Sequence, residues 1–376
     1  MTGTADQPPR PAKPRRWQWS WTVVWTIIVS GVASMFATIA VLMAFSRFTP
    51  VYGFAVLGLC WLAATIVHEA GHALAALCVG WRPVVIAVRP LALRTIGWTI
   101  VPTRRITTPK ARGWVALIPG GPAQATRRKF MIIIAAGPLA SFGSAAVALG
   151  VVAFWPASLM PTRVSVAHIA AGFAILSFHT GLFTALPFSS AGSVSDGWQL
   201  RAMMKPDYDF LGGHPARWLV TLNKACVRLR EWPDWLIDLV ESQSADKPEY
   251  IEMVDALRIG KVLDTFDVSD DAIRAMIARF RDRHGASAWI TSIEAYCLAV
   301  YGDDAESAAA ILVAEPEAEK PSVMALAAQA AIMARSGRRQ EAHTCLKRMI
   351  AACRKESPYA NQTYRDIQRQ IKSITF

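Results

Sequence analysis

Four apolar stretches dominate the first half of the chain, and they constrain its fold more than any other feature. They cover residues 20–45, 51–79, 130–155 and 164–188. Each is long enough for a helix to cross the hydrocarbon core of a bilayer, which takes about 20 residues. Because a backbone in lipid must satisfy its own hydrogen bonds, helices are expected. The chain is therefore predicted to be a multi-pass α-helical membrane protein with about four transmembrane helices.

The charge of the chain divides near residue 195. Residues 1–195 contain 16 Lys and Arg but only two acidic residues, whereas residues 196–376 contain 24 basic and 26 acidic residues. The net charge of +12 thus belongs to the apolar half, which indicates the positive-inside bias of membrane proteins rather than nucleic-acid binding. Basic residues gather before residue 20 and between residues 80 and 129. Both segments and both termini are therefore expected on the cytoplasmic side of a cell membrane.

The second apolar stretch contains the sequence His68-Glu69-Ala70-Gly71-His72. Two histidines four residues apart lie on one helical face and can both bind zinc, while the intervening carboxylate can act as a general base. An ionisable side chain inside a bilayer costs roughly 2.5 to 3.5 kcal/mol and usually marks a function. Glu69 is the only acidic residue between Asp6 and Asp196. The motif therefore predicts a zinc site, the alternative being a histidine pair packed in a helix bundle.

A catalytic zinc usually takes three protein ligands, so a third must lie elsewhere. Residues 73–82 contain no further histidine, which disfavours the metzincin pattern. The remaining candidates are His168, His179 and Asp196. The two histidines also fit hydrogen-bonded residues of a helix bundle, and Asp196 also fits the N-cap of a helix that begins at Gly197. The residues alone leave these alternatives open.

Three separated motifs resemble those of the site-2 protease family of intramembrane zinc metalloproteases. They are His68-Glu69-Ala70-Gly71-His72, then Ala135-Ala136-Gly137-Pro138-Leu139-Ala140-Ser141, and Leu186-Pro187 followed by Asp196-Gly197. Their order and placement fit that family over residues 20–200. The resemblance implies that His68, His72 and Asp196 bind Zn²⁺ and that Glu69 is the catalytic base.

The chain departs from the family pattern near the third motif. Thr184 stands where the family has an asparagine, and the interval from Pro187 to Asp196 is longer than usual. The longer interval predicts a small insertion within Phe188–Ser195. A hydroxyl at Thr184 would offer a single hydrogen-bond donor to the substrate backbone or a developing oxyanion.

The predicted function is hydrolysis of a peptide bond in or near the transmembrane segment of a membrane-anchored protein. The resemblance adds a role in regulated signalling. The protein substrate and the lipid bilayer are the expected partners, and no nucleic acid is expected. The alternative is a catalytically silent relative that acts as a membrane scaffold or regulator, which the departures around Thr184 motivate.

The cytoplasmic segment between the second and third stretches carries two strand-like runs, Val84–Val88 and Ile96–Ile100. They predict a small β-hairpin, because β-branched residues favour strands and Pro90 separates the runs. Its edge could pair with an unwound substrate, or the sheet could merely cap the membrane region. Residues 114–119 are expected to be a flexible gate or an interfacial loop.

Three regions are predicted along the chain. Residues 1–19 form a basic tail, rich in Pro and Arg, that is expected to be disordered, and residues 20–200 form the transmembrane zinc metalloprotease domain. Residues 201–376 are expected to form a cytosolic helical domain that binds a regulator. Gly302 and Gly337, each followed four residues later by Glu, suggest a 35-residue repeat. This repeat is typical of tetratricopeptide-like helical hairpins, with a generic helical domain as the alternative.

Overall fold

The computed structural model describes most of the chain from residue 50 onward. The described residues are 50–95, 98–103, 113–154, 166–190, 193–212, 214–225, 227–243, 248–265, 269–313, 322–356 and 360–375. The predicted basic tail and the first predicted span, residues 20–45, lie outside them. The described chain is mostly helical and contains a small antiparallel sheet, as predicted.

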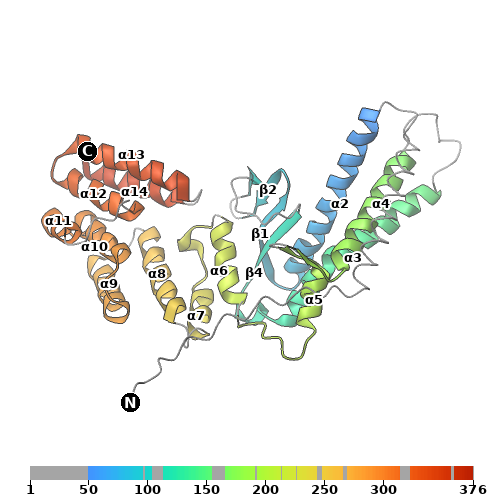
Figure 1. The fold of residues 1–376 in the computed structure, drawn as a ribbon, viewed down its shortest axis with the longest axis horizontal. Coiled ribbons are helices and arrows are strands. Elements are labelled where there is room, and N and C mark those ends of the chain that lie inside the picture. The colour runs from blue at the N-terminus through green and yellow to red at the C-terminus, as the bar shows by residue number, and fades with distance from the viewer. Residues whose placement is uncertain are drawn as a thin grey trace, which may run out of the picture.

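Within the described residues, three helices are long and apolar enough to cross a membrane. They are α2 (Pro50–Cys78), α3 (Arg127–Phe154) and α4 (Val166–Ala185). All three pack against one another (Figure 1). Gly71 of α2 lets the first two approach closely, since a Cβ there would lie 2.6 Å from the Cβ of Ala140. Small residues at such crossings are common where apolar helices pack tightly.

A four-stranded antiparallel sheet lies between α2 and α3 in the sequence. Its strands are β1 (Trp81–Val88), β2 (Leu91–Arg94), β3 (Thr99–Pro102) and β4 (Gly113–Pro119). The order across the sheet is β3-β2-β1-β4. β1 pairs with β4 from Trp81 opposite Pro119 to Val88 opposite Gly113.

The sheet corrects two predictions about this segment. The strand at Val84–Val88 is confirmed as part of β1. The predicted hairpin of this strand with the Ile96–Ile100 run is wrong, because β1 pairs with β2 and β4, and β3 (Thr99–Pro102) pairs with β2. The prediction of a loop or gate at residues 114–119 is wrong, because these residues form β4. The cause is a long-range pairing across about 30 residues, which the local sequence does not encode.

The second half of the described chain contains no helix of membrane-spanning length and composition. A short hairpin, β5 (Ser189–Ser190) and β6 (Ser193–Val194), leads into it. Its helices are α5 (Asp196–Met203), α6 (His214–Lys224), α7 (Asp234–Ser242), α8 (Pro248–Thr265), α9 (Asp270–His284), α10 (Ala288–Val300), α11 (Ala305–Val313), α12 (Val323–Arg335), α13 (Arg339–Glu356) and α14 (Ala360–Thr375). Helices α10 to α13 form two successive pairs, and Gly302 and Gly337 lie in the turns within them.

Two hydrophobic cores hold the described chain together. One joins the end of α2, the sheet and the start of α3 to α6, α7 and the first half of α8. The other joins the end of α8 to α9, α10, α12, α13 and α14. The first core therefore continues across residue 200, where the sequence suggested a domain boundary.

Candidate metal centre

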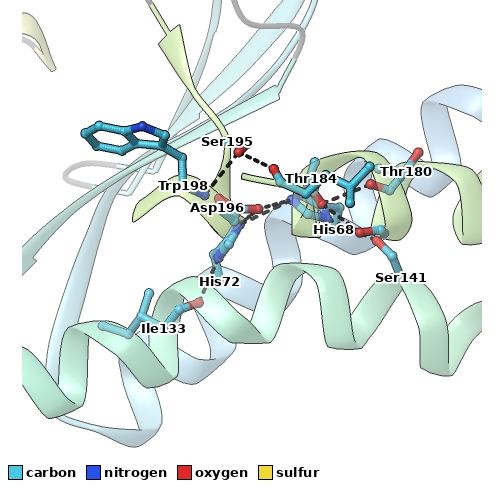
Figure 2. A network of polar contacts seen from close by, with 11 residues as sticks. His68, His72, Ile133, Ser141, Thr180, Thr184, Ser195, Asp196 and Trp198 are labelled. Carbon is cyan, nitrogen blue, oxygen red and sulfur yellow. Dashed lines mark hydrogen bonds and ion pairs between the residues drawn. The ribbon is translucent and has the colours of Figure 1, made fainter. Parts of the chain in front are cut away.

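Three side chains converge where α2 meets the start of α5. The Nε2 atoms of His68 and His72 lie 3.3 Å apart, and Oδ2 of Asp196 lies 3.2 Å from the first and 3.5 Å from the second (Figure 2). A tetrahedral ion with ligands at about 2.0 to 2.1 Å places them about 3.3 to 3.4 Å apart. This His-His-Asp group therefore fits the ligand set of a metal ion.

The other ring nitrogen of each histidine has a partner that orients the ring. Nδ1 of His72 donates to the carbonyl oxygen of Ile133 over 2.8 Å, and Nδ1 of His68 lies 3.0 Å from Oγ of Ser141. Because a carbonyl only accepts, the proton of a neutral His72 lies on Nδ1 and the lone pair of Nε2 faces the centre of the group. Such contacts are typical of metal-binding histidines. The sequence singled out Ser141 within a motif but did not predict this contact.

Gly137 of the predicted Gly-Pro motif has a direct steric role. A Cβ at this position would lie 2.3 Å from Nε2 of His72, so only glycine leaves room for the imidazole. The motif thus shapes the metal group, and the following Pro138 lies within α3 without ending it.

Asp196 reaches the histidines because the chain turns sharply after α4. The segment Phe188–Ser195, where an insertion was predicted, contains the β5–β6 hairpin, which folds back before α5. The helix begins at Asp196 and its N-cap is Ser195, whose Oγ accepts from the Trp198 amide over 3.2 Å. The alternative of Asp196 as N-cap is therefore wrong, and its carboxylate is free to face the histidines.

Two further features concern this turn, the charge of Asp196 and the space beside Gly197. Burial raises the pKa of Asp196, but hydrogen bonds from the Nε2 atoms of His68 and His72, when these atoms are protonated, outweigh burial and hold the pKa below its ordinary value. Gly197 permits the turn, since a Cβ there would lie 1.9 Å from the carbonyl oxygen of Ala185.

Glu69 lies beside the metal group and is 7% exposed. Its carboxylate faces the first residue of β4, because a Cβ on Gly113 would lie 2.2 Å from Oε1 of Glu69. The sheet thus covers this carboxylate at close range. No pattern in the sequence identified Gly113, since the contact depends on how β4 pairs.

The metal group opens into a cavity of about 1010 Å³. Residues of α2, β4, α4, α5 and α6 line it, so the membrane-length helices and the second half of the chain share one space. Glu69, His68, His72 and Asp196 all face this cavity. A substrate could therefore reach the metal group and the carboxylate together.

The other predicted site residues have different surroundings. Thr184 and His179 both line the cavity. The hydroxyl of Thr184 donates to the carbonyl oxygen of Thr180 over 2.9 Å, within its own helix. Within the described residues, neither His168 nor His179 belongs to a group that could hold a metal ion.

No protein-family model, curated protein or solved structure matched the chain. The geometry of the metal group and the motifs of the sequence therefore carry the functional argument.

Proposed function

We propose that the protein is an intramembrane zinc metalloprotease that hydrolyses a peptide bond in or near the transmembrane segment of a membrane-anchored protein. The observation that carries the proposal is that His68 and His72 of the apolar helix α2 converge with Asp196 of α5, beside the buried Glu69. Two nitrogen ligands and one oxygen ligand at tetrahedral spacing favour zinc over the hard cations, which prefer more oxygens.

His68, His72 and Asp196 would hold the zinc ion. The ion would polarise the peptide carbonyl and lower the pKa of water, so that water gives up a proton more easily and becomes a better nucleophile. Glu69 would take the proton of the attacking water and return it to the leaving amine. Its burial beside the metal group, in a cavity that admits a substrate, supports this role.

A helical substrate must be unwound before its backbone can react, because its own hydrogen bonds cover the carbonyls. β4 offers a place to hold it, since it is one of the two edge strands of the described sheet and its residues Gly113 to Leu117 line the cavity. An extended segment can add to such an edge through main-chain hydrogen bonds. The sequence suggested such an edge on a hairpin of Val84–Val88 and Ile96–Ile100, and the proposal places it on β4 instead.

The topology of the proposal adds the residue 20–45 span to the three described helices and places both termini in the cytoplasm. The distribution of Lys and Arg supports this orientation. Residues 201–376 would then face the cytosol and bind a regulator, and the activity would serve regulated signalling, as in the site-2 protease family that the motifs resemble.

One observation favours a second candidate, a catalytically silent membrane scaffold. The Thr184 hydroxyl is engaged within its own helix, so a substrate would have to compete for it. The complete set of His68, Glu69, His72 and Asp196 favours the protease.

The test uses the purified full chain in detergent. Wild-type protein should contain one zinc per chain and should cut an apolar peptide library, with activity lost on chelation and restored by zinc. Glu69→Gln should keep the zinc and lose the cleavage, because it removes the base but no ligand. Zinc-free wild-type protein without activity would refute the proposal, as would a fully active Glu69→Gln variant.

A further inference from the structure

The cavity of the metal group extends to α6, a helix of the second half of the chain. His214, Arg217, Trp218 and Thr221 of this helix line it. None of them belongs to the motifs that predicted the site. Their place in the wall means that a bound segment would contact α6 as well as the metal group.

β4 runs from the metal group towards α6. Gly113, its first residue, faces the carboxylate of Glu69. Pro119, its last residue, pairs with Trp81, and the ring centroid of Trp81 lies 5.4 Å from that of Trp218 in α6. α6 therefore lies at the end of β4 opposite to the catalytic carboxylate, and close to the end of α2 that the proposed topology places in the cytoplasm.

The charges along this path are separated. Glu69 and Asp196 lie at the metal end, whereas Arg217 is the only Lys or Arg among the described residues that line the cavity. Its side chain is exposed, and it has no ion-pair partner within the part of the chain that the structure describes. An unpaired, exposed guanidinium in the wall of a binding cavity can bind a carboxylate.

We propose that Arg217 selects substrates that carry Asp or Glu on the cytoplasmic side of the scissile bond. This inference rests on the proposed function and names its substrate class. The path from Gly113 to Leu117 is four residue steps, or about 13 Å at roughly 3.3 Å per residue. An extended segment beside β4 therefore brings a side chain about four residues from the scissile bond within reach of Arg217. One exposed ion pair gives up to about a fivefold preference.

The experiment measures binding without hydrolysis. Labelled apolar peptides are titrated with full-length Glu69→Gln protein in detergent. The peptides come in pairs that carry Asp or Lys at one position, and this position is moved along the peptide from one pair to the next. The Asp peptide should bind up to about fivefold more tightly than the Lys peptide at one position. As a second substitution in the Glu69→Gln protein, Arg217→Gln should abolish the preference for Asp, Arg217→Glu should invert it and Arg217→Lys should keep it. Raised salt should weaken it, as expected for an exposed pair.

Arg201→Glu is the matched control, because Arg201 is exposed on α5 but does not line the cavity. It should leave the preference unchanged. Equal affinity for the Asp and Lys peptides, or a preference that survives in Arg217→Gln, would overturn the inference. Zinc-dependent hydrolysis without the preference would refute this inference alone. The preference without any hydrolysis by the Glu69-intact protein would refute the proposed function instead.

Discussion

Three glycines shape the candidate site at the scale of single residues. A Cβ on Gly137 would lie 2.3 Å from His72 Nε2, one on Gly113 would lie 2.2 Å from Glu69 Oε1, and Gly197 abuts the end of α4. Contacts this short force a displacement of the neighbouring group. Because these three glycines have no side chains, they determine the space around the metal group as much as His68, His72 and Asp196 do.

Gly137→Ala should weaken metal binding by at least about tenfold, because the new methyl group displaces the imidazole of His72. Gly143→Ala is the matched control on the same helix, since nothing lies within 4 Å of its Cβ position. Zinc affinity measured by chelator competition distinguishes the two variants. Equal affinities would show that His72 can move without cost and would contradict this steric role.

The assignment of the third ligand gives a second test at this scale. Asp196→Ala should lower zinc affinity, because Oδ2 lies within 3.5 Å of both histidine Nε2 atoms. His179→Ala should leave the affinity unchanged, although His179 lines the same cavity. Zinc content after dialysis of both variants is the measurement, and the reverse order would move the ligand to α4.

At the scale of elements, the apolar helices were predictable and the sheet was only partly so. Span length and hydropathy are local properties, so the stretches at 51–79, 130–155 and 164–188 match α2, α3 and α4 closely. Strand pairing is not local, so β4 and its contact with Glu69 were missed. The two histidines of the metal group were predictable because the His68-Glu69-Ala70-Gly71-His72 motif carries chemistry that few other patterns explain, whereas Asp196 followed only from the family resemblance.

The N-cap of α5 is an element-scale feature with a direct test. Oγ of Ser195 accepts from the amides of Phe188 and Trp198, and donates to the carbonyl oxygen of Leu186. Ser195→Ala should cost about 1 kcal/mol of stability and also weaken zinc binding, because the next residue is Asp196.

Ser269→Ala is the control for this prediction, since Oγ of Ser269 caps α9 by accepting from the Ala272 amide. It should lower thermal stability, because it removes a helix cap, and leave zinc affinity unchanged. A Ser195→Ala variant with wild-type zinc affinity would show that the cap does not position Asp196.

At the scale of the whole molecule, an aromatic cluster joins the sheet and α3 to α6. His214 lies in it, with its ring centroid 5.3 Å from Phe130 and 4.6 Å from Phe210, and its Nε2 lies 2.9 Å from the Tyr208 hydroxyl. Burial, with a smaller contribution from Arg217, lowers the pKa of His214 from 6.5 to about 4. The cluster therefore holds a neutral histidine.

This cluster predicts a loss of stability in mild acid. The unfolded chain takes up a proton at this histidine below pH 6.5, whereas the folded chain does so only below about 4. Stability should fall by up to about 2 kcal/mol as the pH drops through this window, allowing for partial exposure of the ring. Thermal unfolding in detergent at pH 7.5 and 5 measures it.

His214→Phe should reduce this pH dependence, whereas His343→Gln, at an exposed position of α13, should keep it. If the stability of His214→Phe depended on pH as strongly as that of the wild type, the loss of stability in mild acid would come from other groups. The same cluster places α6 at the cavity, so it links the stability of the second half to the shape of the site.

The central claim is that Glu69 acts beside a zinc ion on membrane-anchored substrates. The most direct measurement compares the membrane proteomes of cells that contain wild-type protein or Glu69→Gln at equal levels. The account predicts that at least one membrane-anchored protein accumulates uncut in the Glu69→Gln cells and is shortened in the wild-type cells. Identical profiles for the two cells would contradict it.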